Sequence, residues 1–179
     1  DSAEAWTWNG TASSNLTPSA AAPAVRMQYA MAAEPSRSDM LLFGGSGPSA
    51  LGDMWTWSGN SWRQLSLATI PGPRAQASLT FDSRRNQSVL FGGCCDAASS
   101  PLADTWTWDG TTWTQVASTG PSARSFAAMA PLGDKLVLFG GYDADGPCSD
   151  TWTWDGTSWT QVQTSGPSAR ASAALTAVP

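Results

Sequence analysis

The pattern Leu138-Phe139-Gly140-Gly141 recurs along this chain. Each copy continues with a variable loop and a segment such as Asp150-Thr151-Trp152-Thr153-Trp154. The Phe-Gly-Gly unit occurs every 48 residues, at Phe43, Phe91 and Phe139. The Trp-Thr-Trp unit begins at Trp6, Trp55, Trp106 and Trp152. A period near 50 residues that is built from short segments indicates a repeat architecture, so the fold is decided at the level of the repeat.

Each copy of the repeat predicts four antiparallel strands. In the copy that begins near Arg124, residues 125–130 and 135–139 are apolar strands joined by a turn at 131–134. Residues 151–154 and 158–162 are two further strands, and Asp155-Gly156 between them is a dipeptide favoured in hairpins. The double glycine allows positive φ or a close backbone approach. The copy is therefore a four-stranded meander.

The tryptophans indicate how the copies pack. Trp106 and Trp108 lie two residues apart on one predicted strand, so their side chains face the same side of the sheet. A tryptophan-rich face needs another sheet against it, and stacking sheets around an axis provides one. The sequence therefore predicts an all-β fold, a β-propeller of four-stranded antiparallel blades.

These motifs resemble the kelch-repeat β-propellers. The resemblance rests on Leu-Phe-Gly-Gly at 42–45, 90–93 and 138–141, on the aromatic pair after an acidic residue, and on the single tryptophan at 62, 113 and 159. It also includes the proline-containing segment that precedes Arg74, Arg124 and Arg170. Segment 81–93 is similar to bacterial kelch-like proteins in particular. The resemblance implies a fold, because kelch propellers include both binding modules and enzymes.

We expect one domain over residues 1–179, with about three full kelch blades and partial blades at the ends. The part-blade covers 1–25, full blades start near residues 26, 74 and 124, and a terminal strand lies within 170–179, at Ala171–Thr176. Propellers close with about four to eight blades. We therefore expect a homo-oligomer joined head to tail, or part of a longer propeller, and not an isolated open monomer.

Composition argues against several classes of function. Only 13% of residues are charged and the net charge is −5, so no basic surface is available for nucleic acid or an anionic membrane. No apolar run is long enough to span a bilayer. The chain has no histidine, which removes the commonest metal ligand and general base, and the two tyrosines, Tyr29 and Tyr142, cannot complete a copper site of the galactose-oxidase type. We predict no enzyme activity, no metal and no cofactor.

Residues that recur in the same register are interpreted as structural, because a ligand site breaks the symmetry of a repeat. The tryptophan pairs supply core surface, and each recurring arginine is expected to pair with charge or to cap loops. The set comprises Trp55, Trp57, Trp106, Trp108, Trp152, Trp154, Arg74, Arg124, Arg170, Asp53, Asp104 and Asp150. Arg26 and Glu4 continue the two charged series.

Three cysteines lie in equivalent loops of two copies. We favour a Cys95–Cys148 disulfide between neighbouring blades, although Cys94–Cys148, a vicinal Cys94–Cys95 bridge and three free thiols remain alternatives. An odd count leaves at least one thiol unpaired within the chain.

Sequence diversity is concentrated between the double glycine and the acidic residue, on loops that should share one rim. The candidate binding residues on these loops are Ser46, Pro48, Asp96, Ser99, Tyr142, Asp143 and Asp145. Asp143-Ala144-Asp145-Gly146 has the start of a calcium loop but not its later ligands, so a plain loop is favoured.

The function that follows is a non-enzymatic kelch-like module for protein binding or self-assembly, with an extracellular or cell-surface location. The partner would be another protein or further copies of the chain. The alternatives are a carbohydrate-binding module, which would take a glycan, and a non-catalytic part of a larger kelch-type enzyme.

Overall fold

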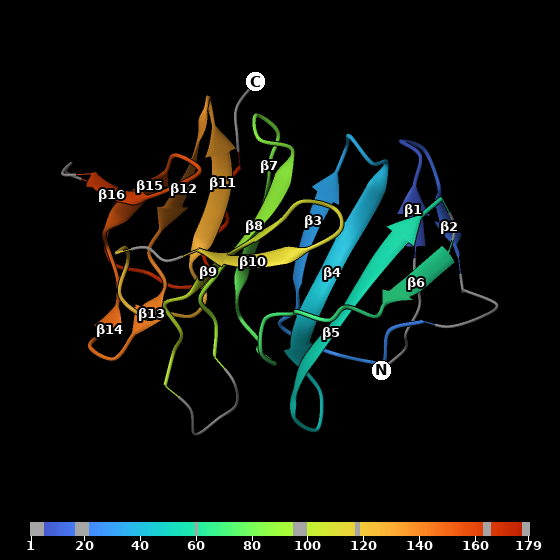
Figure 1. The fold of residues 1–179 in the computed structure, drawn as a ribbon, viewed down its shortest axis with the longest axis horizontal. Helices are drawn as coiled ribbons and strands as arrows, with labels where there is room; N and C mark the ends of the chain where they lie inside the picture. Colours follow the sequence, from blue (N-terminus) through green and yellow to red (C-terminus); the bar gives the residue numbers. More distant parts are fainter. Residues whose placement is uncertain are drawn as a thin grey trace.

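The computed structural model describes residues 6–16, 22–59, 61–94, 100–116, 119–162 and 166–176, and within them every regular element is a strand (Figure 1). Three four-stranded antiparallel sheets form the body, which confirms the predicted blades. The first blade contains β3 (Ala30–Glu34), β4 (Asp39–Ser46), β5 (Ala50–Ser58) and β6 (Ser61–Leu65). The second contains β7 (Ser78–Asp82), β8 (Gln87–Phe91), β9 (Thr105–Trp108) and β10 (Trp113–Val116). The third contains β11 (Ala128–Leu132), β12 (Lys135–Phe139), β15 (Thr151–Trp154) and β16 (Trp159–Val162).

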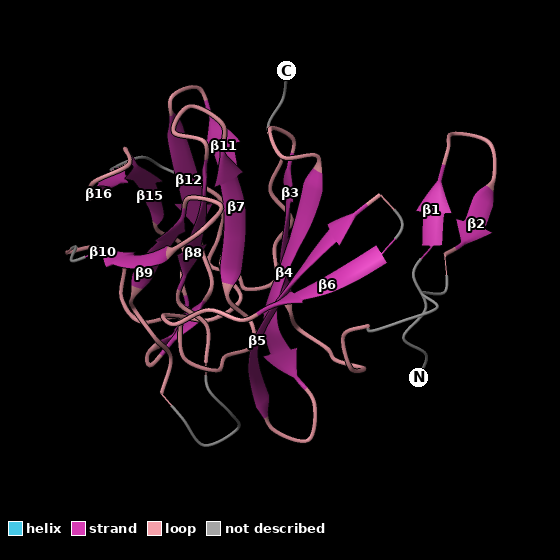
Figure 2. Cartoon of the chain, turned by 45° about the vertical axis from the view of Figure 1, so that its right-hand side comes forward, coloured by secondary structure: helices cyan, strands magenta, loops and turns pink. Residues whose placement is uncertain are grey.

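Two small hairpins complete the described elements. The pair β13 (Tyr142–Asp143) and β14 (Gly146–Pro147) is inserted between β12 and β15 of the third blade. The pair β1 (Trp6–Trp8) and β2 (Ser13–Asn15) corresponds to the third and fourth strands of a blade, and Figure 2 shows it apart from the three sheets. None of the described elements is a helix with the length and hydropathy needed to cross a bilayer.

The hairpin between the third and fourth strands forms as predicted, through a four-residue connection in the second and third blades. In the third blade Trp154 pairs with Trp159, and Asp155 begins the turn between them. The Oδ1 atom of Asp155 accepts hydrogen bonds from the backbone N–H groups of Thr157 and Ser158, both at 2.8 Å. Gly156 then takes a φ of 99°, which a glycine adopts without steric cost.

The first strand of the third blade begins later than the sequence predicts. In the third blade β11 starts at Ala128, not at Ser125, because Phe126 has a left-handed φ of 57°. The N–H of Phe126 donates to the carbonyl of Gln76 in the second blade at 2.9 Å. The same conformation and bond link Gln76 to Gln28, and Ser172 to Phe126. Residues that enter one blade thus bond to the blade before it.

The hydrophobic core lies between blades rather than within them. One buried cluster joins the first and second blades, and another joins the second and third. In the first cluster Trp113 packs against Phe43 of the preceding blade, with ring centroids 6.0 Å apart, and donates its indole N–H to Met54 Sδ. Trp159 repeats this arrangement in the second cluster, so the fourth-strand tryptophan fastens each blade to its predecessor.

The predicted strand at Ala171–Thr176 is not present: the backbone there is bent and then irregular. In the three blades the first strand pairs with the second strand that follows it, as β11 pairs with β12. Among the described residues no strand is assigned after β16, and residues 171–176 belong to none of the described sheets. Its start at Ser172 is nevertheless bonded to Phe126, as in the other blades.

Candidate functional site

The loops that follow the three double glycines lie on one side of the molecule, at the bottom of Figure 1. We call this side the double-glycine rim. It comprises residues 46–50, 94–104 and 142–150, of which 95–99 lie outside the described part of the chain. Loops on a rigid sheet scaffold are where a propeller can vary its binding properties, so the rim is the candidate functional site.

The double glycine joins neighbouring blades. Gly140 has a φ of 66°, and a Cβ there would collide with the carbonyl oxygen of Arg170. The N–H of Gly141 donates to that same carbonyl at 2.9 Å, and the N–H of Arg170 donates to the carbonyl of Cys148 at 2.9 Å. Corresponding contacts join Gly44-Gly45 to Arg74 and Gly92-Gly93 to Arg124. The sequence predicted a close approach at these glycines but not its partner, the entry of the next blade.

Each of the three blades carries the same partly buried cluster of arginine, aspartate and tryptophan at this rim. Arg124 donates to both carboxylate oxygens of Asp150, at 2.5 and 2.9 Å, and to the carbonyl of Gly140 at 2.9 Å. The indole N–H of Trp152 donates to Asp150 Oδ2 at 2.6 Å. The equivalent clusters are Arg26, Asp53 and Trp55, and Arg74, Asp104 and Trp106.

The pKa of each of these aspartates is lowered. For Asp150, burial opposes ionisation, but the hydrogen bonds from Arg124 and Trp152 and the charge of Arg124 outweigh it. The same causes lower the pKa of Asp53 and of Asp104. The three aspartates are therefore ionised at neutral pH, and each is paired with its arginine.

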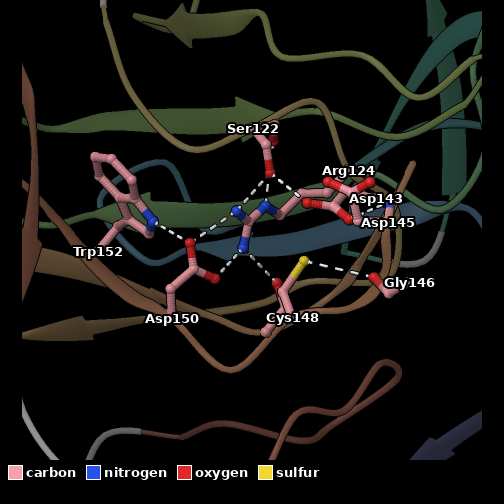
Figure 3. A network of polar contacts seen from close by, with 9 residues as sticks. Ser122, Arg124, Asp143, Asp145, Gly146, Cys148, Asp150 and Trp152 are labelled. Carbon is pink, nitrogen blue, oxygen red and sulfur yellow. Dashed lines mark hydrogen bonds and ion pairs between the residues drawn. The ribbon is translucent and has the colours of Figure 1, made fainter.

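The third blade extends its cluster into the inserted hairpin (Figure 3). Arg124 Nη2 donates to Ser122 Oγ at 2.8 Å, and Ser122 Oγ donates to Asp143 Oδ2 at 2.7 Å. The other oxygen of Asp143 accepts the backbone N–H of Asp145 at 2.9 Å, which closes the turn of the hairpin. The hydrogen bond from Ser122 is the main cause of a lowered pKa at Asp143. This network connects β13 and β14 to the buried ion pair.

The structure brings only some of the candidate binding residues together. Tyr142, Asp143 and Asp145 lie on the hairpin of the third blade, where the Tyr142 side chain is 51% exposed. Ser46 and Pro48 lie on the same rim in the first blade, and the backbone of Ser46 pairs with Met27. Asp96 and Ser99 lie outside the described residues. A site built on the hairpin is therefore separate from the loop of the first blade.

The predicted Cys95–Cys148 disulfide is not formed. Cys148 is a buried free thiol, with its Sγ directed at the carbonyl of Gly146, 3.7 Å away, and Cys95 lies outside the described residues. Burial raises the pKa of the Cys148 thiol to about 11. The Sγ of Cys94 is engaged with Gln76 Oε1 at 3.0 Å. Cys94 and Cys148 thus each contact a residue of the blade to which they belong.

The arrangement is suited to binding more than to catalysis. Ser122 has an aspartate and an arginine beside it but no imidazole to take its proton, and Cys148 is protonated at neutral pH. The described ranges contain no group of three acidic, cysteine or histidine residues placed to hold a metal ion.

Sequence analysis missed Ser122, which links the ion pair to the hairpin. A signal was present, because Gly120-Pro121-Ser122-Ala123-Arg124 recurs as Gly166-Pro167-Ser168-Ala169-Arg170. In both copies the serine carbonyl accepts from the arginine Nε and the serine hydroxyl accepts from Nη2. The serine therefore orients the arginine that follows it.

Comparison with known families supports the assignment from the fold. Residues 57–179 match the family model of the KLHDC2/KLHL20/DRC7 Kelch-repeats domain, which covers more than half of the chain. Among curated proteins no significant match to the chain was found.

Proposed function

Because this chain belongs to the kelch-repeat family, whose domains are generally protein-interaction modules, we propose that it binds a protein partner through the β13–β14 hairpin of its third blade. The site would comprise the exposed Tyr142 and the carboxylates of Asp143 and Asp145, held in place by Ser122. The proposal is for recognition alone, with no reaction catalysed.

The single observation that carries the proposal is the exposed Tyr142 on an anchored hairpin. Tyr142 pairs with Ser125 through two backbone hydrogen bonds, at 2.8 and 3.0 Å, so its backbone is held by the segment that leads into β11. Tyrosine is enriched among the residues that dominate binding energy, since it buries a large ring and keeps a polar hydroxyl. A rigid aromatic side chain loses little entropy when a partner covers it.

Charge favours a basic partner surface. Asp143 and Asp145 lie beside Tyr142, and no basic side chain in the described part of the chain forms an ion pair with them, whereas Asp150 is paired with Arg124. Opposite charge across an interface increases the association rate and aids specificity. We therefore expect a partner that presents lysine or arginine around an apolar contact.

The test compares retention of extracellular and surface proteins of the source cells by three immobilised forms of the chain. We expect the wild type and Leu132→Ala to retain the same protein and Tyr142→Ala to lose it, with about a tenfold increase in Kd. Leu132 is the matched control, because it is also an exposed large apolar side chain but lies at the far end of β11. Equal retention by Tyr142→Ala would contradict the proposed site.

A second candidate function, glycan binding, is favoured by one observation. Trp6 and Trp8 on β1 are 59% and 65% exposed, while the equivalent Trp152 is half-buried and Trp154 is buried. Exposed aromatic faces can stack on sugar rings. A glycan that quenches the fluorescence of the wild type but not of Trp8→Ala would support this function; quenching that persists in Trp8→Ala would place the sugar elsewhere.

A further inference from the structure

The turn that joins β1 to β2 contains Asn9-Gly10, the only Asn-Gly dipeptide in the sequence. Both residues are exposed, and Figure 2 shows the hairpin apart from the three blades. Nothing lies within 4 Å of the position that a Cβ of Gly10 would occupy. Solvent water therefore reaches the side-chain amide of Asn9 and the backbone nitrogen that follows it.

An asparagine that precedes a glycine can lose its amide nitrogen without an enzyme. The backbone nitrogen of Gly10 gives up its proton to water and attacks Cγ of Asn9, and Nδ2 takes up a proton and leaves as ammonia. The product is a five-membered succinimide, which glycine permits because it has no Cβ to hinder the approach. Water then opens the ring at either carbonyl and yields aspartate or isoaspartate. The net change converts an amide and water into a carboxylate and ammonium.

The folded turn places hydrogen-bond donors where charge develops in this reaction. Asn9 Oδ1 accepts hydrogen bonds from the N–H of Thr11, the hydroxyl of Thr11 and the N–H of Ala12, each at 2.9 Å. Attack on Cγ puts negative charge on Oδ1, and donors that are already oriented stabilise such an oxyanion. Among the described residues none accepts a hydrogen bond from the N–H of Gly10, so its proton is available to water.

The equivalent turns of two blades show that an aspartate fits this position. Asp109 Oδ1 accepts the N–H and the hydroxyl of Thr111, both at 2.7 Å, and the N–H of Thr112 at 2.8 Å. Asp155 has the same three donors in its own turn. The glycine that follows has a φ of 96–102° in all three turns. Asn9 is thus the amide form of a turn that is otherwise built on a carboxylate.

We propose that Asn9 is a modification site, which deamidates through a succinimide with Gly10 and is activated by the donors of its own turn. The modification adds one negative charge beside β1. The isoaspartate product also adds a methylene to the backbone next to the Trp8–Ser13 pair, which changes how β1 presents its exposed tryptophans. This site is independent of the β13–β14 hairpin proposed above for binding.

The test follows deamidation by mass spectrometry of peptides after timed incubation of the folded chain at pH 8 in heavy-oxygen water. Asn86 is the internal control, because the residue after it is Gln87, which has a Cβ and pairs with Asp82 in the sheet. We expect the Asn9 peptide to gain one heavy oxygen while the Asn86 peptide stays unchanged. Equal rates at the two asparagines would overturn the proposal.

The role of the turn is tested with Thr11→Val, which removes the hydroxyl donor and keeps the branched shape. We expect it to slow native deamidation of Asn9 about fivefold, the rate equivalent of one hydrogen bond. Thr11→Ser keeps the hydroxyl and should match the wild type. In urea, where the turn is lost, all three chains should react at one rate, so a variant that merely folds poorly is recognised by a native rate equal to its rate in urea. Equal native rates for a folded Thr11→Val and the wild type would overturn activation by the turn.

Discussion

The guanidinium of Arg124 donates to both oxygens of the Asp150 carboxylate, at 2.5 and 2.9 Å, and thereby ties the entry of the third blade to its third strand. The pair recurs as Arg26 with Asp53 and as Arg74 with Asp104. The three pairs hold the same register in every blade, while the loops beside them differ in sequence from blade to blade.

Asp150→Asn should lower the free energy of unfolding by about 3 kcal/mol, because it leaves the buried Arg124 guanidinium without its countercharge. Urea denaturation followed by tryptophan fluorescence measures the change. Asp145→Asn is the control, since Asp145 is exposed, and its effect should stay within about 0.5 kcal/mol. Equal losses in the two variants would show that the ion pair contributes nothing specific.

Gly140→Ala should destabilise the protein more than Gly133→Ala. Both glycines have a left-handed φ, 66° and 61°, so both alanines carry a backbone strain of roughly 1–2 kcal/mol. Only at position 140 would the new Cβ also meet the Arg170 carbonyl, whereas nothing lies within 4 Å of it at position 133. The difference between the two unfolding free energies isolates the contact between blades, and a difference of zero would argue against that contact.

Trp159→Phe should cost about 2 kcal/mol or more, because it removes the indole N–H that donates to the buried Thr105 hydroxyl at 3.0 Å and leaves space beside Phe91. Trp62→Phe makes the same chemical change at the equivalent, half-buried position of the first blade. We expect the smaller loss there. Thermal unfolding of both variants is sufficient, and a larger loss at Trp62 would reverse the expected order.

Stability should decline in acid. The pKa values of Asp53, Asp104 and Asp150 are lower in the folded chain than in the unfolded chain, so the folded state binds fewer protons. The resulting stabilisation is complete above the unfolded pKa of about 3.9 and is lost as pH falls through the folded values. Urea midpoints between pH 7 and pH 2 should fall below about pH 4, and less steeply in Asp150→Asn. An unchanged slope in that variant would contradict this origin.

Cys148 should react slowly with iodoacetamide at pH 8. Its pKa of about 11 keeps the thiol protonated, and only the thiolate is nucleophilic. Mass spectrometry of peptides after timed alkylation, native and in urea, gives the comparison. We expect protection of at least about tenfold in the native chain. Rapid native labelling would show that the thiol is neither buried nor protonated.

Several features were accessible from sequence because they depend on neighbours along the chain. The strands β9 and β10 follow from alternation around Asp109-Gly110, and the repetition of this unit gives the blade and its register. The late start of β11 was not accessible, since the φ of Phe126 is stabilised by a bond to Gln76 of another blade. Sequence likewise placed Tyr142 on a loop, but its anchoring through Ser125 depends on tertiary packing.

By itself the sequence determined the repeat, the four-stranded unit and the residues that recur, because strand periodicity and turn chemistry act over a few positions. Only the tertiary structure decided what those residues contact: the double glycine meets the Arg170 carbonyl, and Trp159 reaches Thr105. It also left Cys148 as a thiol and residues 171–176 without a strand. These outcomes depend on pairing between segments far apart in the chain, which local preference does not specify.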